Sequence, residues 1–301
     1  MNAPGSGTQA SAARTDRAPL SPVPPLPMRA PRTVLPAQAC DTHIHVFGAE
    51  SRYPLAMTRH YTPALCGLDR YWQLASMLGV TRAVVVQPSV YAFDNRALLD
   101  ALRGDDARCR GVAVIGPDVD DTTLDAMHAA GVRGVRANLV NSNGLSAADA
   151  LRLAPRLRAR GWHLQLQVEI DAFTGLEDFI VRAALPVVVD HFGLPKSSDP
   201  ARGEFPRLLA CVKRGLCWVK MSGHYRFADT HVTPLARALA QCNPERLLWA
   251  TDWPHPGLGS APMPDDSRLV DDLAAWLPDE ALRRQVLVDN PTKLYWSWQP
   301  T

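Results

Sequence analysis

Short apolar runs rich in β-branched residues alternate with longer amphipathic stretches from about residue 38 to the C-terminal end of the chain. The short runs predict buried strands and the amphipathic stretches predict helices, because their apolar positions repeat with the period of each element. Eight runs fit strands, at Ala39–Val46, Arg82–Gln87, Gly111–Ile115, Gly134–Leu139, His163–Glu169, Pro186–Asp190, Cys217–Met221 and Leu247–Thr251. This alternation is typical of βα units around a parallel sheet.

Helices are predicted between these strands and after the last one. Four of the intervening stretches are Leu68–Leu78, Ala147–Arg160, Phe205–Arg214 and Pro234–Gln241, and two later ones are Asp265–Leu277 and Asp279–Leu287. Gly79, Gly161 and Gly215 follow three of them, where a glycine can end a helix. The pattern predicts the fold class α/β, as a (β/α)8 TIM barrel, which fits 301 residues that are 47% hydrophobic.

The first 32 residues differ in composition from the rest. They are rich in Ala, Pro, Ser and Arg, with four prolines between Pro22 and Pro27. Because such a segment cannot bury enough surface to fold alone, we expect residues 1–32 to form a disordered tail and residues 33–301 to form a single barrel domain with C-terminal helices. Met28 is a second candidate for the first residue, so the status of residues 1–27 stays open.

Charge and composition indicate a small-molecule partner. The chain carries 32 basic and 30 acidic residues, a net charge of +2, and its basic residues are dispersed, so we expect no nucleic-acid partner. No apolar run approaches the roughly 20 residues that cross a bilayer, and no signal-peptide core is evident, so no membrane association is expected. Six cysteines without a CxxC pair suit reduced thiols in a cytoplasmic protein. A monomer and a homodimer both stay open.

Polar residues stand where the predicted strands end, which is where TIM barrels carry their active sites. His43 and His45 end the first strand, and the alternation of side chains along a strand places both on the same side. His191 follows the sixth strand and Asp252 follows the eighth. Three imidazoles and a carboxylate in one ring could bind a divalent metal or, without a metal, polarise a carbonyl group.

Each of these residues also has an interpretation without chemistry. An isolated His-x-His pair is more often two unrelated histidines, and an aspartate at the position of Asp252 can cap the next helix. The convergence of four strand-end groups favours the active-site interpretation. Because the bulky residues 253–256 follow Asp252, its carboxylate could be desolvated enough to act as a general base on water.

Three other polar residues near strand ends receive supporting roles. Lys220 lies within the seventh predicted strand, and without a visible partner that lowers its pKa it is interpreted as structural. Glu169 and Asp190 are interpreted as groups that orient histidines.

Four segments together, CDTHIHVFG, VDHFGLP, WVKMSG and WATDWPHP, resemble the amidohydrolase-related (amidohydrolase 2) family, and within it the group of 2-pyrone-4,6-dicarboxylate lactonases. The resemblance runs from about Ala39 to Trp296 and includes the segments VVVQPSVYAFDN, GVRGVRAN and NPTKLYW. It implies a barrel like that of the metal-dependent hydrolases and the hydrolysis of lactones or related carbonyl compounds.

The resemblance also implies roles for individual residues. It places His43, His45 and His191 in the set that polarises the carbonyl or binds a metal, and Asp252 in the activation of water. It implies further that the substrate is contacted by Tyr61, Ser89, Arg136, Arg226 and His255. Since a guanidinium can hold a carboxylate through two parallel hydrogen bonds, the two arginines suggest an acidic substrate, although either could form an ordinary surface ion pair.

The chain departs from the lactonase group at three places. Leu194 stands where that group has an arginine, Gln167 stands where it has a tyrosine, and residues 141–143 (Asn-Ser-Asn) replace a basic pair. The departures affect substrate contacts and leave the four catalytic candidates intact. They point to a different lactone, such as a sugar-acid lactone or a muconolactone-like compound.

The cofactor is predicted to be either absent or one divalent metal, with Zn²⁺ as the expected ion held by His43, His45, His191 and Asp252. A two-metal centre is disfavoured because the fourth strand offers no lysine and the fifth has no histidine at its C-terminal end. Two alternatives to a lactonase stay open. One is a Zn²⁺-dependent decarboxylase of the same superfamily, and the other is a non-catalytic binding barrel.

Overall fold

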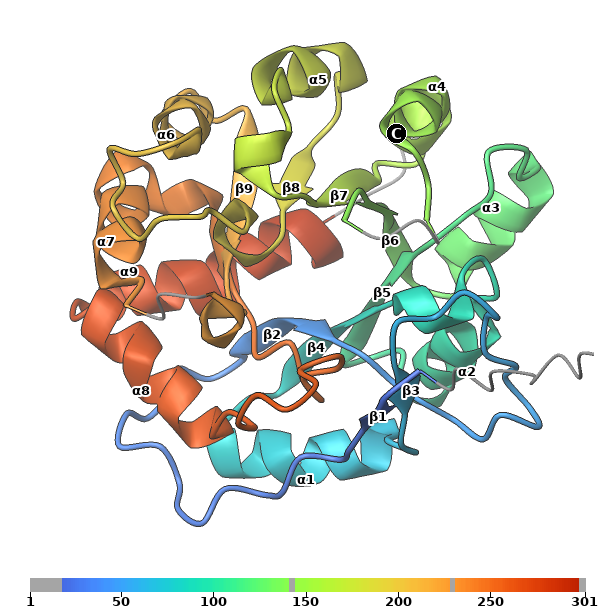
Figure 1. Cartoon of the computed structure of the whole chain (residues 1–301), viewed down its shortest axis with the longest axis horizontal. Coiled ribbons are helices and arrows are strands. Elements are labelled where there is room, and N and C mark those ends of the chain that lie inside the picture. Colours follow the sequence, from blue (N-terminus) through green and yellow to red (C-terminus); the bar gives the residue numbers. More distant parts are fainter. Residues whose placement is uncertain (1–17, 141–143, 228–230, 298–301) are drawn as a thin grey trace, which may run out of the picture.

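The fold is an eight-stranded parallel barrel, seen from one end in Figure 1. The structure is a computed structural model that describes residues 18–140, 144–227 and 231–297. Neighbouring strands follow the order β10-β9-β8-β7-β6-β5-β4-β2. Their bounds are β2 Cys40–Ile44, β4 Arg82–Val86, β5 Cys109–Ala113, β6 Val132–Asn138, β7 His163–Gln167, β8 Val187–Val189, β9 Cys217–Met221 and β10 Leu247–Trp249.

The ring closes between its first and last strands through the segment that follows β10. The amide of Asp252 donates to the carbonyl of His43 over 3.0 Å, and the amide of His45 donates to the carbonyl of Trp253 over 2.8 Å. Ile44 and Trp253 thereby form a parallel bridge. The closure is short, yet it fixes the two segments that carry the candidate catalytic residues against each other.

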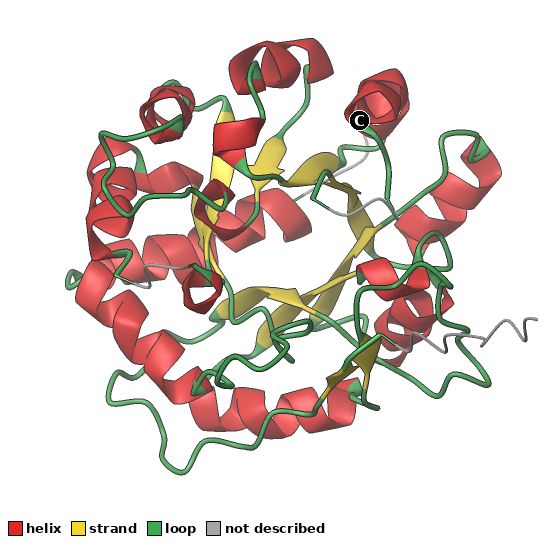
Figure 2. Cartoon of the chain, viewed as in Figure 1, coloured by secondary structure: helices red, strands yellow, loops and turns green. Residues whose placement is uncertain are grey.

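Helices surround the barrel on its outside (Figure 2). Their bounds are α1 Leu68–Leu78, α2 Arg96–Gly104, α3 Asp121–Ala129, α4 Ala147–Arg158, α5 Leu176–Ala183, α6 Phe205–Lys213, α7 Thr233–Cys242, α8 Asp266–Trp276 and α9 Glu280–Arg284. Each apolar helix face packs against the outer faces of the strands in one continuous core. No helix among the described residues is both long enough and apolar enough to span a membrane.

The predicted (β/α)8 TIM barrel is confirmed, and all eight predicted strands occur within a few residues of their predicted bounds. The predicted helix ends also hold: Gly79 follows α1 with a φ of 82°, and its amide donates to the carbonyl of Ala75. One predicted helix differs, because Asp279–Leu287 contains the short α9 and then a π-helical turn at Gln285–Asp289.

The N-terminal segment differs from the predicted tail over residues 18–32. There the strand β1 (Leu20–Ser21) pairs in parallel with β3 (Thr62–Pro63). Farther along, the guanidinium of Arg29 and the backbone amide of Arg32 both donate to the carboxylate of Asp271 on α8. The segment is held because groups on the barrel satisfy its polar atoms, which its own composition cannot reveal. Residues 1–17 lie outside the described part of the chain.

The barrel interior has an apolar layer and a polar layer. The strands supply a small apolar cluster that includes Val84, Val188 and Trp218, together with Tyr295 from the C-terminal segment. His163, at the start of β7, packs edge-to-face on Tyr295 with ring centroids 5.1 Å apart, on the side away from the catalytic candidates. Above this layer the interior becomes polar, with Gln165 and Lys220 fully buried.

We expect Gly134→Ala to lower the free energy of unfolding by about 1–3 kcal/mol through overpacking. A Cβ at Gly134 would collide with the imidazole of His163, and Tyr295 blocks that ring from moving away. Urea unfolding measures the effect. Gly104→Ala is the matched control, because a Cβ there meets nothing within 4 Å and the helical site favours alanine by up to about 1 kcal/mol. Equal stability of the two variants would contradict the close packing at His163.

Candidate active site

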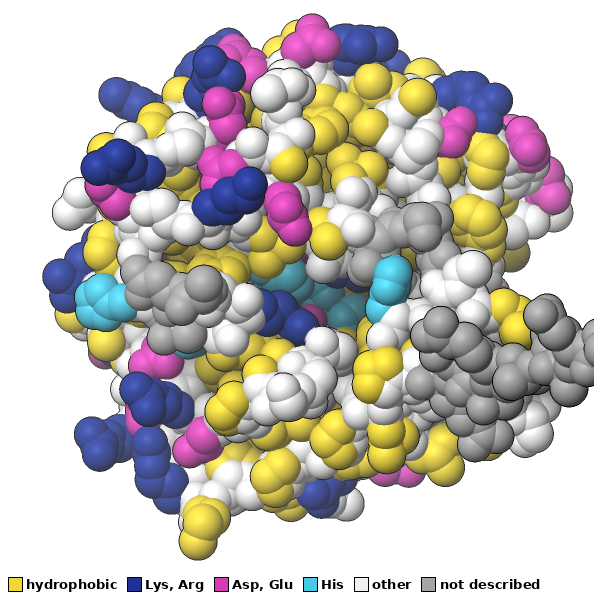
Figure 3. Space-filling view, viewed as in Figure 1, with side chains coloured by type: hydrophobic (Ala, Val, Ile, Leu, Met, Phe, Trp, Pro, Cys, Tyr) yellow, Lys and Arg dark blue, Asp and Glu magenta, His cyan; other side chains and the backbone are white. Residues whose placement is uncertain are grey.

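A polar cavity of about 180 Å³ opens at the C-terminal ends of the strands. Figure 3 shows this hollow near the centre of the face, with histidine and basic side chains gathered inside it. Its walls come from the segments that follow β2, β4, β8, β9 and β10 and from residues at the C-terminal ends of β6 and β7. The polar lining consists of His45, His60, Tyr61, Ser89, Arg136, Asn138, Gln167, His191, Arg226 and Asp252. The position matches the one expected for an active site in this fold.

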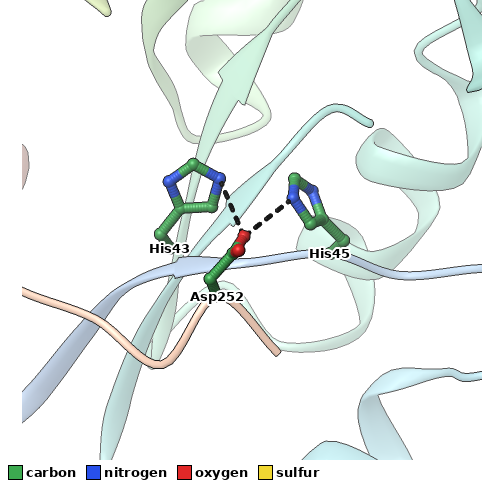
Figure 4. Close-up of side chains that lie close together, drawn as sticks. All are labelled: His43, His45 and Asp252. Carbon is green, nitrogen blue, oxygen red and sulfur yellow. Dashed lines mark ion pairs between the residues drawn. The ribbon is translucent and has the colours of Figure 1, made fainter. Parts of the chain in front are cut away.

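Three imidazoles converge on one oxygen of Asp252 (Figure 4 shows two of them). The Oδ1 atom lies 3.4 Å from His45 Nε2, 3.7 Å from His43 Nε2 and 3.9 Å from His191 Nε2. All four side chains are at most 5% exposed. The structure therefore brings together the four residues predicted to be catalytic.

Two of these residues adopt unusual backbone conformations that place their side chains over the barrel. Asp252 has a φ of 65° and His191 a φ of 51°, in a region that few non-glycine residues adopt. Such residues persist where surrounding contacts hold them. The Asp252 amide is held by the carbonyl of His43, and His191 begins a 3₁₀ turn, His191–Gly193, in which its carbonyl accepts from Leu194.

The partners of the Nδ1 atoms leave the Nε2 atoms free to face Asp252. His45 Nδ1 lies 2.7 Å from the carbonyl of Val86, which can only accept, so Nδ1 carries the proton in the neutral ring. His43 Nδ1 lies 3.3 Å from the carboxylate of Asp190, and His191 Nδ1 lies 2.9 Å from the hydroxyl of Ser222. For His43, Asp190 accepts the Nδ1 proton while Lys220 Nζ makes a longer contact of 3.4 Å with the same atom. The Ser222 hydroxyl can accept the Nδ1 proton of His191, so each Nε2 atom can present a lone pair.

Burial keeps two of the rings uncharged at neutral pH. It holds the pKa of His43 well below 6.5 and lowers the pKa of His191 to about 4. Asp252 behaves in the opposite way. Although burial raises the pKa of its carboxyl group, the positive charge of Arg226 and then the neighbouring His191 hold it well below 3.8. The site combines neutral imidazoles with an ionised carboxylate.

This buried group can bind one metal ion. The Nε2 lone pairs of the three histidines and the Oδ1 atom of Asp252 are all electron-rich and would repel one another unless a cation lay between them. In addition, His43 Nε2 is buried without a hydrogen-bond partner among the described residues. Ligands about 2.0–2.1 Å from a tetrahedral zinc ion lie roughly 3.3–3.4 Å apart, close to the observed spacings. His43, His45 and Asp252 form one candidate set, and His43, Asp190 and His191 form an overlapping one.

A second layer of charged groups supports His43 from below. Lys220 Nζ donates to the carbonyl of Thr42 and to Gln165 Oε1, each over 2.8 Å, and lies 3.5 Å from Asp190 Oδ1. Burial lowers the pKa of Lys220 to about 8. Asp190 Oδ2 accepts from Arg136 Nε over 3.1 Å and from Gln165 Nε2 over 3.0 Å.

The contacts in this layer can be compared with the supporting roles that the sequence suggested for Lys220, Asp190 and Glu169. Asp190 does lie against a histidine, His43, as its assigned role requires. For Lys220 the sequence offered no partner that lowers its pKa. In the structure burial is the main cause of the lowering, and Asp190, which follows the neighbouring strand β8, raises the pKa. Glu169 does not orient a histidine, because its side chain is exposed and lies outside the cavity.

The two arginines predicted to contact substrate differ in their availability. Arg226 donates through Nε and Nη2 to Asp252 Oδ2, over 2.8 and 2.7 Å, and through Nη1 to the carbonyl of Pro256. Arg136 bonds Asp190 only through Nε, and its Nη groups have no acceptor among the described residues while the side chain lines the cavity. Arg136 therefore offers an open guanidinium edge, and Arg226 is committed to the carboxylate of Asp252.

The remaining predicted substrate contacts divide in the same way. Tyr61 and Ser89 line the cavity, whereas His255 does not. His255 is fully buried behind Asp252, with Nδ1 2.7 Å from the Tyr225 hydroxyl and Nε2 3.0 Å from Asp266 Oδ1. The prediction that His255 contacts substrate therefore has no support in the geometry, because the fully buried ring does not line the cavity.

Sequence reasoning missed some of the lining. Asn138 has no role in the sequence-based prediction, although its position at the end of β6 could have indicated one, whereas the resemblance already places Gln167, at the end of β7, among the substrate contacts. His60 lies in the long connection between β2 and α1, where no periodic signal marks a residue. The segment 141–143, which replaces a basic pair in the lactonase group, lies outside the described residues.

Comparison with known proteins identifies the family. Residues 40–296 match the amidohydrolase family, and the chain therefore belongs to it. It is 37% identical to a 2-pyrone-4,6-dicarboxylate hydrolase of Comamonas testosteroni, over 88% of this chain and 92% of that protein. It is 35% identical to a 4-sulfomuconolactone hydrolase of Rhizobium radiobacter, over 87% and 91%. A solved Pseudomonas putida structure assigned as a 2-pyrone-4,6-dicarboxylic acid hydrolase is 33% identical, with a TM-score of 0.74 over 87% and 98%.

We expect the metal-free protein to lose about 2 kcal/mol of unfolding free energy between pH 7 and pH 5 through His191 alone. The pKa of His191 is lowered from 6.5 to about 4 on folding, so the unfolded chain binds more protons and stability falls as the pH falls through this window. Urea unfolding with a chelator present at both pH values measures the loss. His191→Gln should reduce it, whereas His60→Gln, at the exposed rim, should keep it. An unchanged loss in His191→Gln would contradict the assignment.

Proposed function

We propose that this amidohydrolase hydrolyses the ester C–O bond of a small carboxylated lactone and releases a hydroxy acid. The observation that best supports this proposal is the ionised carboxylate of Asp252, with one oxygen turned toward the cavity among three imidazoles. The open guanidinium of Arg136 lies in the same cavity. The names of the relatives, a pyrone-dicarboxylate hydrolase and a sulfomuconolactone hydrolase, describe the same class of reaction on anionic lactones.

In the proposed reaction Asp252 carries one proton from water to the leaving alkoxide. Asp252 Oδ1 accepts a proton from a water molecule while the water oxygen forms a bond to the lactone carbonyl carbon. The tetrahedral intermediate then collapses, the ring C–O bond breaks, and the alkoxide takes the proton back from Asp252. One water is consumed, and the product carries a hydroxyl group and a new carboxyl group, which releases its proton to solvent at neutral pH. Arg226 keeps Asp252 ionised and fixes its second oxygen away from the water.

The polarisation of the carbonyl favours one bound divalent metal. Because Val86 takes the Nδ1 proton of His45, the neutral ring presents a lone pair at Nε2 and has no proton there to give to an oxyanion. His43, His45, His191 and Asp252 would hold the ion, and mixed nitrogen and oxygen ligands in a tetrahedral arrangement suit Zn²⁺. When bound, such an ion supplies a Lewis acid that polarises a carbonyl and lowers the pKa of a water molecule.

The cavity selects for one carboxylate rather than two. Arg136 offers the one guanidinium edge that is free among the described lining residues, since Arg226 is paired with Asp252. Gln167 and Asn138 add neutral hydrogen-bonding groups beside it. This combination suits a lactone that carries a single carboxylate together with hydroxyl groups, such as a sugar-acid lactone, or a muconolactone-like ring. A pyrone dicarboxylate would lack a second cationic partner.

Acid release from a panel of lactones tests the proposal directly. Rings with one carboxylate should be converted, and the same rings without the carboxylate should show at least a tenfold lower kcat/KM, as expected for the loss of one charge-assisted contact. Release of CO2 without lactone opening would instead identify the decarboxylase alternative. Tight binding of the whole panel without conversion would identify a binding barrel.

On the best substrate, Asp252→Asn should reduce kcat by about 10²-fold or more, because the amide keeps the shape of the side chain and cannot accept the proton from water. Glu169→Gln is the matched control, since it makes the same carboxyl-to-amide change on an exposed side chain outside the cavity. A kcat in Asp252→Asn within tenfold of the wild type would exclude this role for Asp252.

Elemental analysis of protein purified without chelators should find about one zinc ion per chain, in line with a single four-ligand site. His43→Gln should reduce the zinc content well below that of the wild type, because His43 contributes one of the converging Nε2 atoms. His60→Gln changes a rim histidine and should keep it. Full lactonase activity in protein shown to contain no metal would reject the metal while leaving the proposed hydrolysis intact.

A further inference from the structure

A chain of hydrogen-bonding groups lies behind Asp252, on the side away from the cavity. Asp266 is the first residue of α8, and its Oδ1 lies 3.0 Å from His255 Nε2. His255 Nδ1 lies 2.7 Å from the Tyr225 hydroxyl, which lies 3.1 Å from Asp252 Oδ2. Asp266 and His255 are almost completely buried, and neither they nor Tyr225 line the cavity. The hydrogen-bond chain therefore reaches the cavity through Asp252, which Tyr225 contacts directly.

The direction of the hydrogen bonds follows from what each group can donate. A carboxylate only accepts, so Asp266 requires the proton of His255 to sit on Nε2. In the neutral ring Nδ1 then accepts, and its partner is the Tyr225 hydroxyl at 2.7 Å. The phenol has one proton and three acceptors within reach: His255 Nδ1 at 2.7 Å, Asp252 Oδ2 at 3.1 Å and the carbonyl of Thr251 at 3.3 Å. That proton serves the shortest contact, to His255, and is withheld from Asp252.

We propose that Asp266, His255 and Tyr225 are positioning residues, which direct the Tyr225 hydroxyl proton away from Asp252 and so keep the full acceptor strength of its carboxylate for the cavity side. This inference rests on the proposed function, because it assumes that Asp252 accepts a proton from water. Arg226 then supplies the charged hydrogen bonds to Asp252 Oδ2 and fixes its orientation. Tyr225 fills the space beside that oxygen without donating to it.

The hydrogen-bond chain predicts a specific effect of replacing Asp266. The amide introduced by Asp266→Asn can donate to His255 Nε2, which favours the ring with its proton on Nδ1. His255 Nδ1 then donates to the Tyr225 oxygen, and the Tyr225 hydroxyl proton turns to Asp252 Oδ2, which at 3.1 Å is nearer than the carbonyl of Thr251 at 3.3 Å and carries the negative charge. The extra donor weakens Asp252 as a proton acceptor. Asp266→Asn thereby slows the reaction, although His255 and Tyr225 separate Asp266 from Asp252 in the hydrogen-bond chain.

Steady-state kinetics with four variants tests the chain. Asp266→Asn should lower kcat about tenfold, the effect of one hydrogen bond to a charged group, and leave KM within about twofold. Tyr225→Phe should stay within about threefold of the wild type, because its hydroxyl does not donate to Asp252. The double variant Tyr225→Phe/Asp266→Asn should recover the rate of Tyr225→Phe, since phenylalanine has no proton to redirect.

A matched control exists on the same helix. Asp272 also lies on α8 and pairs with a histidine, His224, over 3.2 Å, but neither residue belongs to the chain behind Asp252. Asp272→Asn should leave kcat unchanged. Additive losses in the double variant, or a tenfold loss in Tyr225→Phe alone, would overturn the proposal, because both outcomes would make Tyr225 a donor to Asp252 in the wild type.

The ¹⁵N chemical shifts of the His255 ring test the same inference without any substrate. The wild type should show a neutral ring with its proton on Nε2, and Asp266→Asn should move that proton to Nδ1. A wild-type ring protonated on Nδ1, or on both nitrogens, would overturn the proposal even if Asp266→Asn does not fold. If no lactone is converted, the proposed function fails, and the wild-type spectrum still decides the direction of the hydrogen bonds.

Discussion

The active site depends on the backbone pairing between β2 and the segment after β10. Two hydrogen bonds, from the amides of Asp252 and His45 to the carbonyls of His43 and Trp253, close the barrel at this seam. The same bonds set Asp252 against both histidines of β2 and hold it in a positive-φ conformation. The contacts that close the barrel therefore also hold the site together, so a change that opened the seam would separate the carboxylate from the imidazoles.

Buried charge is arranged in two layers around this seam. Asp252 is balanced by Arg226 at the level of the cavity, and Asp190 is balanced by Lys220 and Arg136 one layer deeper. Each carboxylate would be strongly destabilising if buried alone, so each depends on its cations. The two carboxylates also differ in what they contact. Asp190 orients the His43 ring, and Asp252 keeps one oxygen for the cavity.

The cations also explain why resemblance alone is a poor guide to specificity. The resemblance implied the same role for Arg136 and Arg226, yet only Arg136 keeps unpaired donors among the described residues at the cavity. His255 likewise follows Asp252 closely in the sequence and points the other way, into a buried chain with Tyr225 and Asp266. What a side chain can bind is decided by the partners it already has.

The sequence by itself determined the barrel and the four converging groups. Apolar periodicity is a local property, so it located all eight strands, and the rule that active sites lie at strand ends then selected His43, His45, His191 and Asp252. Tertiary structure alone decided the packing of residues 18–32 on Asp271, the contact of Lys220 with Asp190, and the burial of His255. These features depend on atoms brought together from distant parts of the chain, and no local pattern records which partner a polar group will meet.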